Sequence, residues 1–127
     1  PSFYQMQRQS LFTYLIVSKG HVDACVFVSA LSDGAVYFRA LCVHKDQRRR
    51  AYGTRLTRHV LKQHPKVVLS IAWPQKRTAQ TEPLVRHAAK LFRFYRKFGF
   101  EHYETQGDYV YMLYERGTRE SLLKASN

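Results

Sequence analysis

A short basic loop, Arg48-Arg49-Arg50, is the stretch of this sequence best suited to hold a charged ligand. It follows an apolar run over residues 35–43, which predicts a buried strand, and precedes residues 54–62, which predict a helix. The start of a helix presents free backbone N–H groups and the positive end of the helix dipole. Gly53 adds a position where a ligand can approach the backbone closely. Since such a site binds anions, we expect this loop to hold the pyrophosphate of a coenzyme.

The elements around this loop are expected to form a sheet. Apolar runs over residues 11–17 and 22–30 precede the run over residues 35–43, and short turns separate them, which predicts an antiparallel meander. After the loop come a helix over about residues 53–63 and a nearly continuous apolar run over residues 66–73, typical of a strand buried on both faces. Strand, helix and strand in this order favour a parallel pair with a right-handed crossover.

A second helix is expected from Glu82 to about Phe98, with Thr81 as its N-cap. Its apolar stripe is expected to contain Leu84, Ala88, Leu91, Phe92 and Tyr95. Strands over residues 100–105 and 109–115 then surround a Gly-Asp hairpin signal. Residues 1–10 predict no clear element, and the polar tail over residues 117–127 is compatible with a loose helix.

Two short motifs carry a family resemblance. The run Arg48-Arg49-Arg50-Ala51-Tyr52-Gly53 resembles the Gln/Arg-x-x-Gly-x-Gly/Ala signature of the GNAT superfamily of N-acetyltransferases, which bind acetyl-CoA. Arg48 and Gly53 match the signature, whereas Ala51 stands where the family usually has glycine, a residue that adopts positive φ more readily. The later run Tyr95-Arg96-Lys97-Phe98-Gly99-Phe100 resembles the family's Tyr-x-x-x-Gly-Phe.

The resemblance covers about residues 11–114 and implies an α/β (α+β) acyl-CoA N-acyltransferase fold. Such a fold has a mixed, mostly antiparallel sheet with a central parallel strand pair and flanking helices. We therefore expect residues 1–127 to form a single GNAT-like acetyltransferase domain. The family's usual N-terminal strand and substrate-covering helices are expected to be missing or reduced to residues 1–10.

The resemblance also assigns residues to the coenzyme. In the family, the main chain of the strand before the signature pairs with the pantetheine arm, which implies this role for Leu41, Cys42 and Val43. Pantetheine amides need N–H and C=O partners, and the end of a strand offers both. The residues expected around the pyrophosphate are Arg48, Arg49, Arg50, Ala51, Gly53 and Thr54.

Tyr95 is the residue for which the resemblance implies a catalytic role. A tyrosine at the matching position of the family often protonates the departing CoA thiolate, and general acid help is typically worth about 10²–10⁴-fold. The alternative is a core aromatic residue on an amphipathic helix. No general base stands out, because the strand before the signature carries no carboxylate. A water chain, Ser70, Glu101 or Glu104 could take the proton of an amine.

These residues predict direct transfer of an acetyl group from acetyl-CoA to a primary amine in a ternary complex. A small amine, a protein or an aminoacyl-tRNA could accept it, and the net charge of +12 favours an acidic or nucleic-acid-bearing acceptor. One alternative is a nucleic-acid-binding module that uses the second helix, through Lys90, Arg93, Arg96 and Lys97. Another is a CoA-binding protein without catalytic activity.

The remaining histidines and cysteines predict no metal site. Cys25 and Cys42 lack the paired spacing of zinc ligands, and we expect them as small core residues of a protein from a reducing compartment, the cytoplasm or the nucleus. His59 and His64 do not face each other on a helix, and we expect them at the surface. No apolar run has the length of a membrane span, so no membrane partner is expected, and the oligomeric state is left open.

Overall fold

The computed structural model describes residues 1–48 and 50–117, and its contacts divide the chain into two compact units. The first unit ends at Val67 and the second begins at Val68, within strand β5 (Lys66–Ala72). Apart from Gly117, the tail for which the sequence suggests a loose helix lies outside the described residues.

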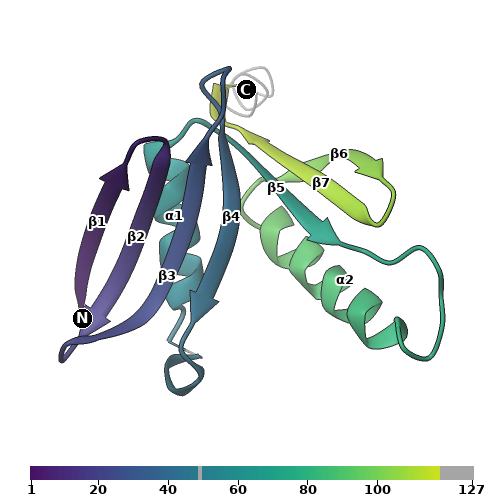
Figure 1. Cartoon of the computed structure of the whole chain (residues 1–127), viewed down its shortest axis with the longest axis horizontal. Coiled ribbons are helices and arrows are strands. Elements are labelled where there is room, and N and C mark those ends of the chain that lie inside the picture. The colour runs from purple at the N-terminus through teal and green to yellow at the C-terminus, as the bar shows by residue number, and fades with distance from the viewer. Residues whose placement is uncertain (49, 118–127) are drawn as a thin grey trace, which may run out of the picture. The chain divides into compact units, whose positions relative to one another are not determined.

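The first unit is an antiparallel meander with one long helix against it (Figure 1). Its strands are β1 (Ser2–Arg8), β2 (Leu11–Ser18), β3 (His21–Ala30) and β4 (Val36–Val43), and each pairs antiparallel with the next. Helix α1 (Tyr52–Gln63) contacts β2, β3 and β4. The residues that α1 buries are Tyr52, Leu56, Thr57, Val60 and Leu61. The meander and the helix predicted from the sequence are thus confirmed.

Strand β1 is an element that the sequence pattern does not predict. All seven of its residues pair with β2, from Ser2 opposite Val17 to Arg8 opposite Leu11. All seven are also exposed, so neither face imposes the apolar alternation by which a strand is recognised. The strand is therefore held by backbone pairing across a short turn rather than by burial.

Two histidines and three aromatic rings cluster where α1 meets the first strands. The His59 ring lies 4.3 Å from the Phe3 ring and 4.9 Å from the Tyr14 ring, measured between centroids. His64 lies 4.9 Å from Phe12, and its Nε2 is 2.7 Å from the Tyr14 hydroxyl. The expectation that these histidines lie at the surface is wrong, because both are half-buried against rings that come from β1 and β2.

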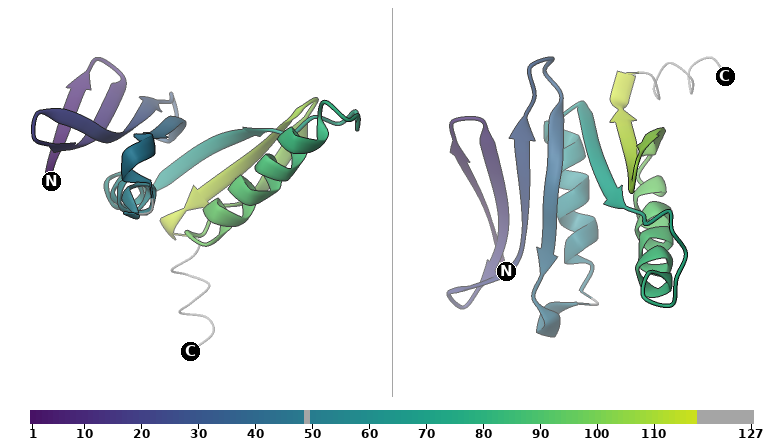
Figure 2. Two further views of the ribbon diagram at one scale, coloured as in Figure 1. Left: turned by 90° about the horizontal axis from the view of Figure 1, so that it is seen from below. Right: turned by 45° about the vertical axis from the view of Figure 1, so that its right-hand side comes forward.

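The second unit combines one helix with a strand and a hairpin (Figure 2). After β5 come α2 (Glu82–Arg96), β6 (Glu101–Gln106) and β7 (Tyr109–Glu115), and the strand order is β5-β7-β6. Helix α2 buries Val85, Ala88 and Tyr95. The prediction that Leu84 belongs to the apolar stripe is wrong, because Leu84 is exposed and the next residue, Val85, is buried in its place.

The loop before α2 is closed by hydroxyl groups. Thr81 occupies the N-cap position as predicted, but its side chain does not cap the helix. Its hydroxyl instead donates to the Lys76 carbonyl at 2.7 Å and accepts from the Thr78 N–H at 2.8 Å. Thr81 thus fixes the chain that enters α2.

The predicted fold class is confirmed. The seven strands belong to one mixed, mostly antiparallel sheet with one parallel pair, and two α-helices flank it within the described part of the chain. Neither α1 nor α2, the long helices of the described residues, has the length and apolar character needed to cross a membrane.

We expect the stability of the fold to fall when the histidine cluster is acidified. Burial lowers the pKa of both His59 and His64, and for His64 the neighbouring His59 adds to the effect. The unfolded chain then binds more protons than the folded one below about pH 6.5, so the free energy of unfolding decreases as pH falls through that value. Thermal melts of a His64→Gln variant between pH 7.5 and pH 5.5 should show a smaller loss of Tm than the parent protein.

The matched control is His102→Gln, because His102 is exposed on β6. This variant should keep the parent's pH dependence. An unchanged pH dependence in His64→Gln would contradict the role of the buried imidazole.

Candidate functional site

Strand β4 carries a β-bulge at Arg39. Phe27 of β3 pairs with Ala40, whereas the next residue, Val28, pairs with Phe38, so Arg39 is an extra residue on β4. The bulge also marks a change in burial: Val36 and Phe38 are buried, but no residue from Arg39 to Val43 is. Bulges bend a strand and recur beside active sites. The end of β4 is thus set apart from its buried beginning.

The three residues expected beside pantetheine form this exposed end of β4. Leu41 lies opposite Val26, Cys42 opposite Cys25, and Val43 opposite Ala24 on β3. Leu41 and Val43 are half-buried, whereas Cys42 is exposed. The structure places them together at the end of one strand, as the sequence predicts, and their contact with a pantetheine arm stays a prediction.

Cys25 and Cys42 face each other across β3 and β4 as free thiols. Burial raises the pKa of Cys25, and the neighbouring Cys42 raises it further. The expectation that both cysteines are core residues is wrong, since Cys42 is exposed and Cys25 only half-buried. Among the described residues, no group of histidines, cysteines and carboxylates could hold a metal ion.

The chain leaves β4 through a single helical turn, Lys45–Gln47, that local hydrogen bonds fix. The His44 N–H donates to the Asp23 carbonyl at 2.7 Å, and the Gln47 N–H donates to the His44 carbonyl at 2.8 Å. Arg48 follows in an extended conformation, and both Arg48 and Arg50 are exposed. The predicted site residue Arg49 lies outside the described residues.

Helix α1 begins without any side-chain cap. Ala51 occupies the N-cap position in the left-handed conformation, with φ 59° and ψ 27°. Its side chain makes no capping hydrogen bond, and the first turn has no acidic residue. A helix start of this kind has unsatisfied donors and a positive dipole end, so it fits an anionic group such as a phosphate.

The first turn of α1 is where the remaining predicted residues lie. Gly53 and Thr54 are both half-buried and follow the buried Tyr52. Arg55 comes next, and its guanidinium lies 5.7 Å from the centre of the Tyr52 ring. The structure thus brings Ala51, Gly53 and Thr54 together at the uncapped helix end.

Tyr95 lies near the end of α2 in the second unit, and its ring is only 8% exposed. It contacts Phe94 and Phe100 at centroid distances of 5.1 and 5.6 Å. Burial raises the pKa of Tyr95 to about 12. The phenol therefore keeps its proton over the whole physiological range, which suits a proton or hydrogen-bond donor, while its ring contacts also serve the core.

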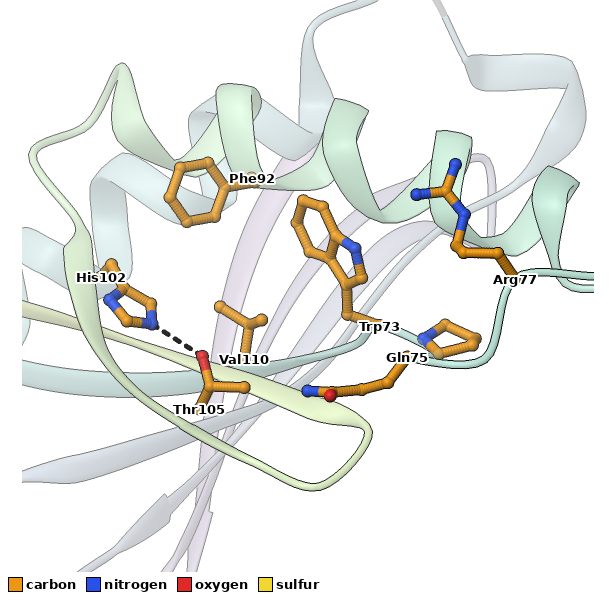
Figure 3. Close-up of a pocket in the computed structure, with 8 residues that line it drawn as sticks. Trp73, Gln75, Arg77, Phe92, His102, Thr105 and Val110 are labelled. Carbon is orange, nitrogen blue, oxygen red and sulfur yellow. Dashed lines mark hydrogen bonds between the residues drawn. The ribbon is translucent and has the colours of Figure 1, made fainter.

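A pocket of about 450 Å³ in the second unit is a feature that the sequence does not reveal (Figure 3). The Trp73 and Phe92 rings meet edge to face in it at 6.1 Å, and His102 Nε2 lies 2.9 Å from the Thr105 hydroxyl. Its lining residues are Trp73, Pro74, Gln75, Arg77, Phe92, His102, Thr105 and Val110. Apolar rings with a few polar groups at the rim are typical of sites for small organic ligands.

Hydrogen bonds join the loop after β5 to the tip of the β6–β7 hairpin and so shape this pocket. The Trp73 N–H donates to the Asp108 carbonyl at 2.6 Å, and the Gln75 N–H donates to an Asp108 carboxylate oxygen at 3.1 Å. The Gln75 side chain donates to the Gly107 carbonyl at 2.8 Å. Trp73 is the single tryptophan of the chain, so its fluorescence reports on this pocket alone.

A family model described as an acetyltransferase (GNAT) domain matches residues 10–102, which is most of the chain. The chain belongs to the GNAT acetyltransferase family. A comparison with curated protein sequences finds no match.

Solved structures with a similar fold include GNAT enzymes with different acceptors. One is an aminoglycoside 6'-N-acetyltransferase complexed with coenzyme A, with a TM-score of 0.63 and 15% identity over 82% of this chain and 72% of that chain. Another is a GNAT family acetyltransferase from Elizabethkingia anophelis with acetyl-CoA bound, with a TM-score of 0.62 and 13% identity over 84% and 76%. A third is the ribosomal-protein-S18-alanine N-acetyltransferase from Escherichia coli, with a TM-score of 0.58 and 15% identity over 84% and 68%. At such identities, the likeness shows the fold alone.

Membership of the GNAT family explains the backbone at Ala51. The family signature usually has glycine at this position, and the structure shows the left-handed conformation that glycine adopts without penalty. Alanine holds the same conformation here at a cost on the order of 1 kcal/mol. At Ala51, the backbone conformation is thus one that a glycine would adopt, although the residue differs.

Several features of the two units cannot be found from spacing alone. Trp73, Phe92 and His102 come from three separate segments, and only the folded second unit brings them together. The bulge at Arg39 lies in an apolar run that reads as an uninterrupted strand. Arg39 itself, a basic residue within that apolar run, is the one sequence signal that could have indicated the bulge.

We expect Ala51→Gly to stabilise the protein, because glycine removes the strain of the left-handed conformation at the N-cap. The gain should be about 0.5–1 kcal/mol, which corresponds to an increase in Tm of about 2–5 °C for a chain of this size. Denaturant unfolding and thermal melts measure both quantities.

Ala89→Gly in the middle of α2 is the matched control, since it should destabilise the protein by about 1 kcal/mol. A loss of stability in Ala51→Gly as large as in Ala89→Gly would show that Ala51 is not strained.

Proposed function

We propose that this protein is an N-acetyltransferase that transfers the acetyl group of acetyl-CoA to a primary amine by direct attack in a ternary complex. The observation that carries the proposal is the uncapped start of α1, which follows the exposed, bulged end of β4 within a protein of the GNAT family. We also propose that residues 1–127 act as one acetyltransferase domain.

Acetyl-CoA is the cofactor that fits the first unit best, and it supplies a thioester carbonyl that an amine can attack. The main chain of Leu41, Cys42 and Val43 would bind the amides of the pantetheine arm. The pyrophosphate would lie at the N–H groups of the first turn of α1, beside Gly53 and Thr54. The arginines of the preceding loop, Arg48, Arg49 and Arg50, would add charge-assisted contacts. The coenzyme complexes of similar fold support this assignment.

Tyr95 would donate a hydrogen bond to the sulfur of the leaving thiolate. A thiol has a pKa of about 8.5, so a phenol of pKa about 12 does not give up its proton fully to that sulfur at equilibrium. Tyr95 would therefore stabilise the charge that develops on sulfur through a hydrogen bond, and solvent would supply the final proton. Such help is worth about 10²–10⁴-fold at most.

The acceptor amine must lose a proton before it can attack. A primary alkylamine has a pKa of about 10.4, so only a small fraction is neutral at pH 7. Glu101 and Glu104 are exposed on β6, and Ser70 is half-buried on β5, so each stays open as a route for this proton. The acceptor is a primary amine on a small molecule, a protein or an aminoacyl-tRNA.

A CoA-binding protein without catalytic activity is the competing function. Both functions require acetyl-CoA to raise the Tm of the protein. Release of free CoA in the presence of a panel of amines occurs only with the acetyltransferase, so this assay separates the two.

Gly53→Glu should weaken acetyl-CoA binding at least 100-fold, because it places a carboxylate where the pyrophosphate is expected. Glutamate is well tolerated in the first turn of a helix, so the fold should remain. Titration calorimetry with acetyl-CoA measures the loss.

The control is Gly117→Glu, which adds the same charge at an exposed glycine with no atom within 4 Å of the new Cβ. It should bind acetyl-CoA like the parent protein. An unchanged affinity in Gly53→Glu would remove the loop from the cofactor site.

Tyr95→Phe should lower kcat about 10- to 1,000-fold and leave the affinity for acetyl-CoA nearly unchanged, because it removes only the phenolic donor. In the parent protein, kcat/KM for an alkylamine should increase with pH up to about 9, as the neutral amine becomes more abundant. No decline from Tyr95 should occur in that range, since its pKa is about 12. Steady-state kinetics across pH 6.5–9.5 provide the test, and full activity in Tyr95→Phe would exclude Tyr95 from the reaction.

A further inference from the structure

A second pocket, of about 330 Å³, lies in the first unit, beside α1. Phe3 of β1 forms one wall, and the other lining residues, Arg55, Arg58, His59 and Lys62, come from α1. Four of these five residues lie outside the proposed cofactor site, whereas Arg55 adjoins it, because it follows Thr54 in the first turn of α1. The pocket therefore requires an explanation of its own.

The charge of this pocket is uniformly positive. Arg55, Arg58 and Lys62 are spaced three and four residues apart, so they share one face of α1. Within the described part of the chain, neither Arg55 nor Arg58 forms an ion pair. The sequence supplies no carboxylate on α1, and Glu82 is the only acidic residue between Asp46 and Glu101. Such a surface attracts phosphate groups strongly.

The aromatic wall adds a second kind of contact. The Phe3 ring lies 4.3 Å from the His59 ring, yet Phe3 is still 38% exposed. His59 Nε2 is shielded from solvent and has no hydrogen-bond partner in the part of the chain that the structure describes. An exposed ring beside a row of cations is the combination that single-stranded nucleic acids require, since their bases stack and their phosphates pair.

We propose that this pocket binds single-stranded nucleic acid, with consecutive phosphates on Arg55, Arg58 and Lys62 and one base against Phe3. The cations extend over about 10 Å of helix, which is longer than a single phosphate group and matches a run of phosphates. Stacking on Phe3 requires an unpaired base, which favours a single strand over a duplex. The site goes beyond acetyl transfer and does not depend on it.

The test compares two variants that lose the same charge. Fluorescence anisotropy with a labelled 12-nucleotide RNA, and with DNA of the same sequence, measures affinity for the parent protein, for R55A/R58A/K62A and for R86A/K90A/R93A. The second triple variant removes three exposed cations from one face of α2. We expect the affinity of R55A/R58A/K62A for the oligonucleotide to fall at least tenfold. The plot of log affinity against log salt concentration should also become less steep, by about 2. R86A/K90A/R93A should lose less than threefold.

The aromatic contact is tested separately. Phe3→Leu should weaken single-strand binding about fivefold or more, because leucine keeps the apolar contact but cannot stack. Phe3→Tyr keeps an aromatic ring and should bind like the parent protein. A duplex of the same length should bind more weakly than the single strand. Equal affinity in Phe3→Leu and the parent protein would overturn the placement of a base on Phe3.

Two outcomes would overturn the proposal as a whole. Equal losses in the two triple variants would indicate general attraction of a basic protein for polyanions. Competition between coenzyme A and the oligonucleotide, with loss of acetyl-CoA binding in R55A/R58A/K62A, would make the pocket a part of the cofactor site. Titration calorimetry with acetyl-CoA on the same variants measures cofactor binding directly. It therefore distinguishes a pocket that belongs to the cofactor site from a failure of the proposed acetyl transfer.

Discussion

The chain must pass from β4 into α1 through a residue that has left-handed backbone and no side chain able to cap a helix. Ala51 meets both conditions at once, because its φ is positive and its methyl group accepts no hydrogen bond. The direction in which α1 begins and the unsatisfied N–H groups at its start thus have one cause. Without that turn, the first N–H groups would be satisfied by a serine or aspartate, as in most helices.

The exposed end of β4 precedes the uncapped start of α1 in the chain. The bulge at Arg39 divides the strand into a buried beginning and an exposed end, so the last residues of β4 are not committed to the core. The turn Lys45–Gln47 then carries the chain to Arg48 by backbone hydrogen bonds that use no apolar contact. Binding residues on exposed backbone between two rigid elements can be placed precisely while remaining accessible.

Sequence reasoning succeeds here where burial imposes a pattern and fails where it does not. The strands from Leu11 to Val43 and both helices were predictable, since each has an apolar face with a regular period. The β6–β7 hairpin was predictable from its Gly-Asp turn, although β6 is exposed throughout. Strand β1 was not, because all of its residues are exposed. His59 and His64 were misplaced because their partners, Phe3, Phe12 and Tyr14, lie far away in the sequence. The candidate cofactor loop was predictable from the short signature, whereas both pockets depend on segments that only tertiary structure brings together.

The backbone at Ala51 also limits which amino acids this position can accept. Valine, isoleucine and threonine are excluded, since a branched Cβ is poorly compatible with positive φ. Asparagine and aspartate suit that backbone, but their side chains would occupy the very N–H groups that an incoming anion needs. Under the proposed coenzyme role, residue 51 therefore favours small amino acids such as glycine and alanine over branched or capping ones.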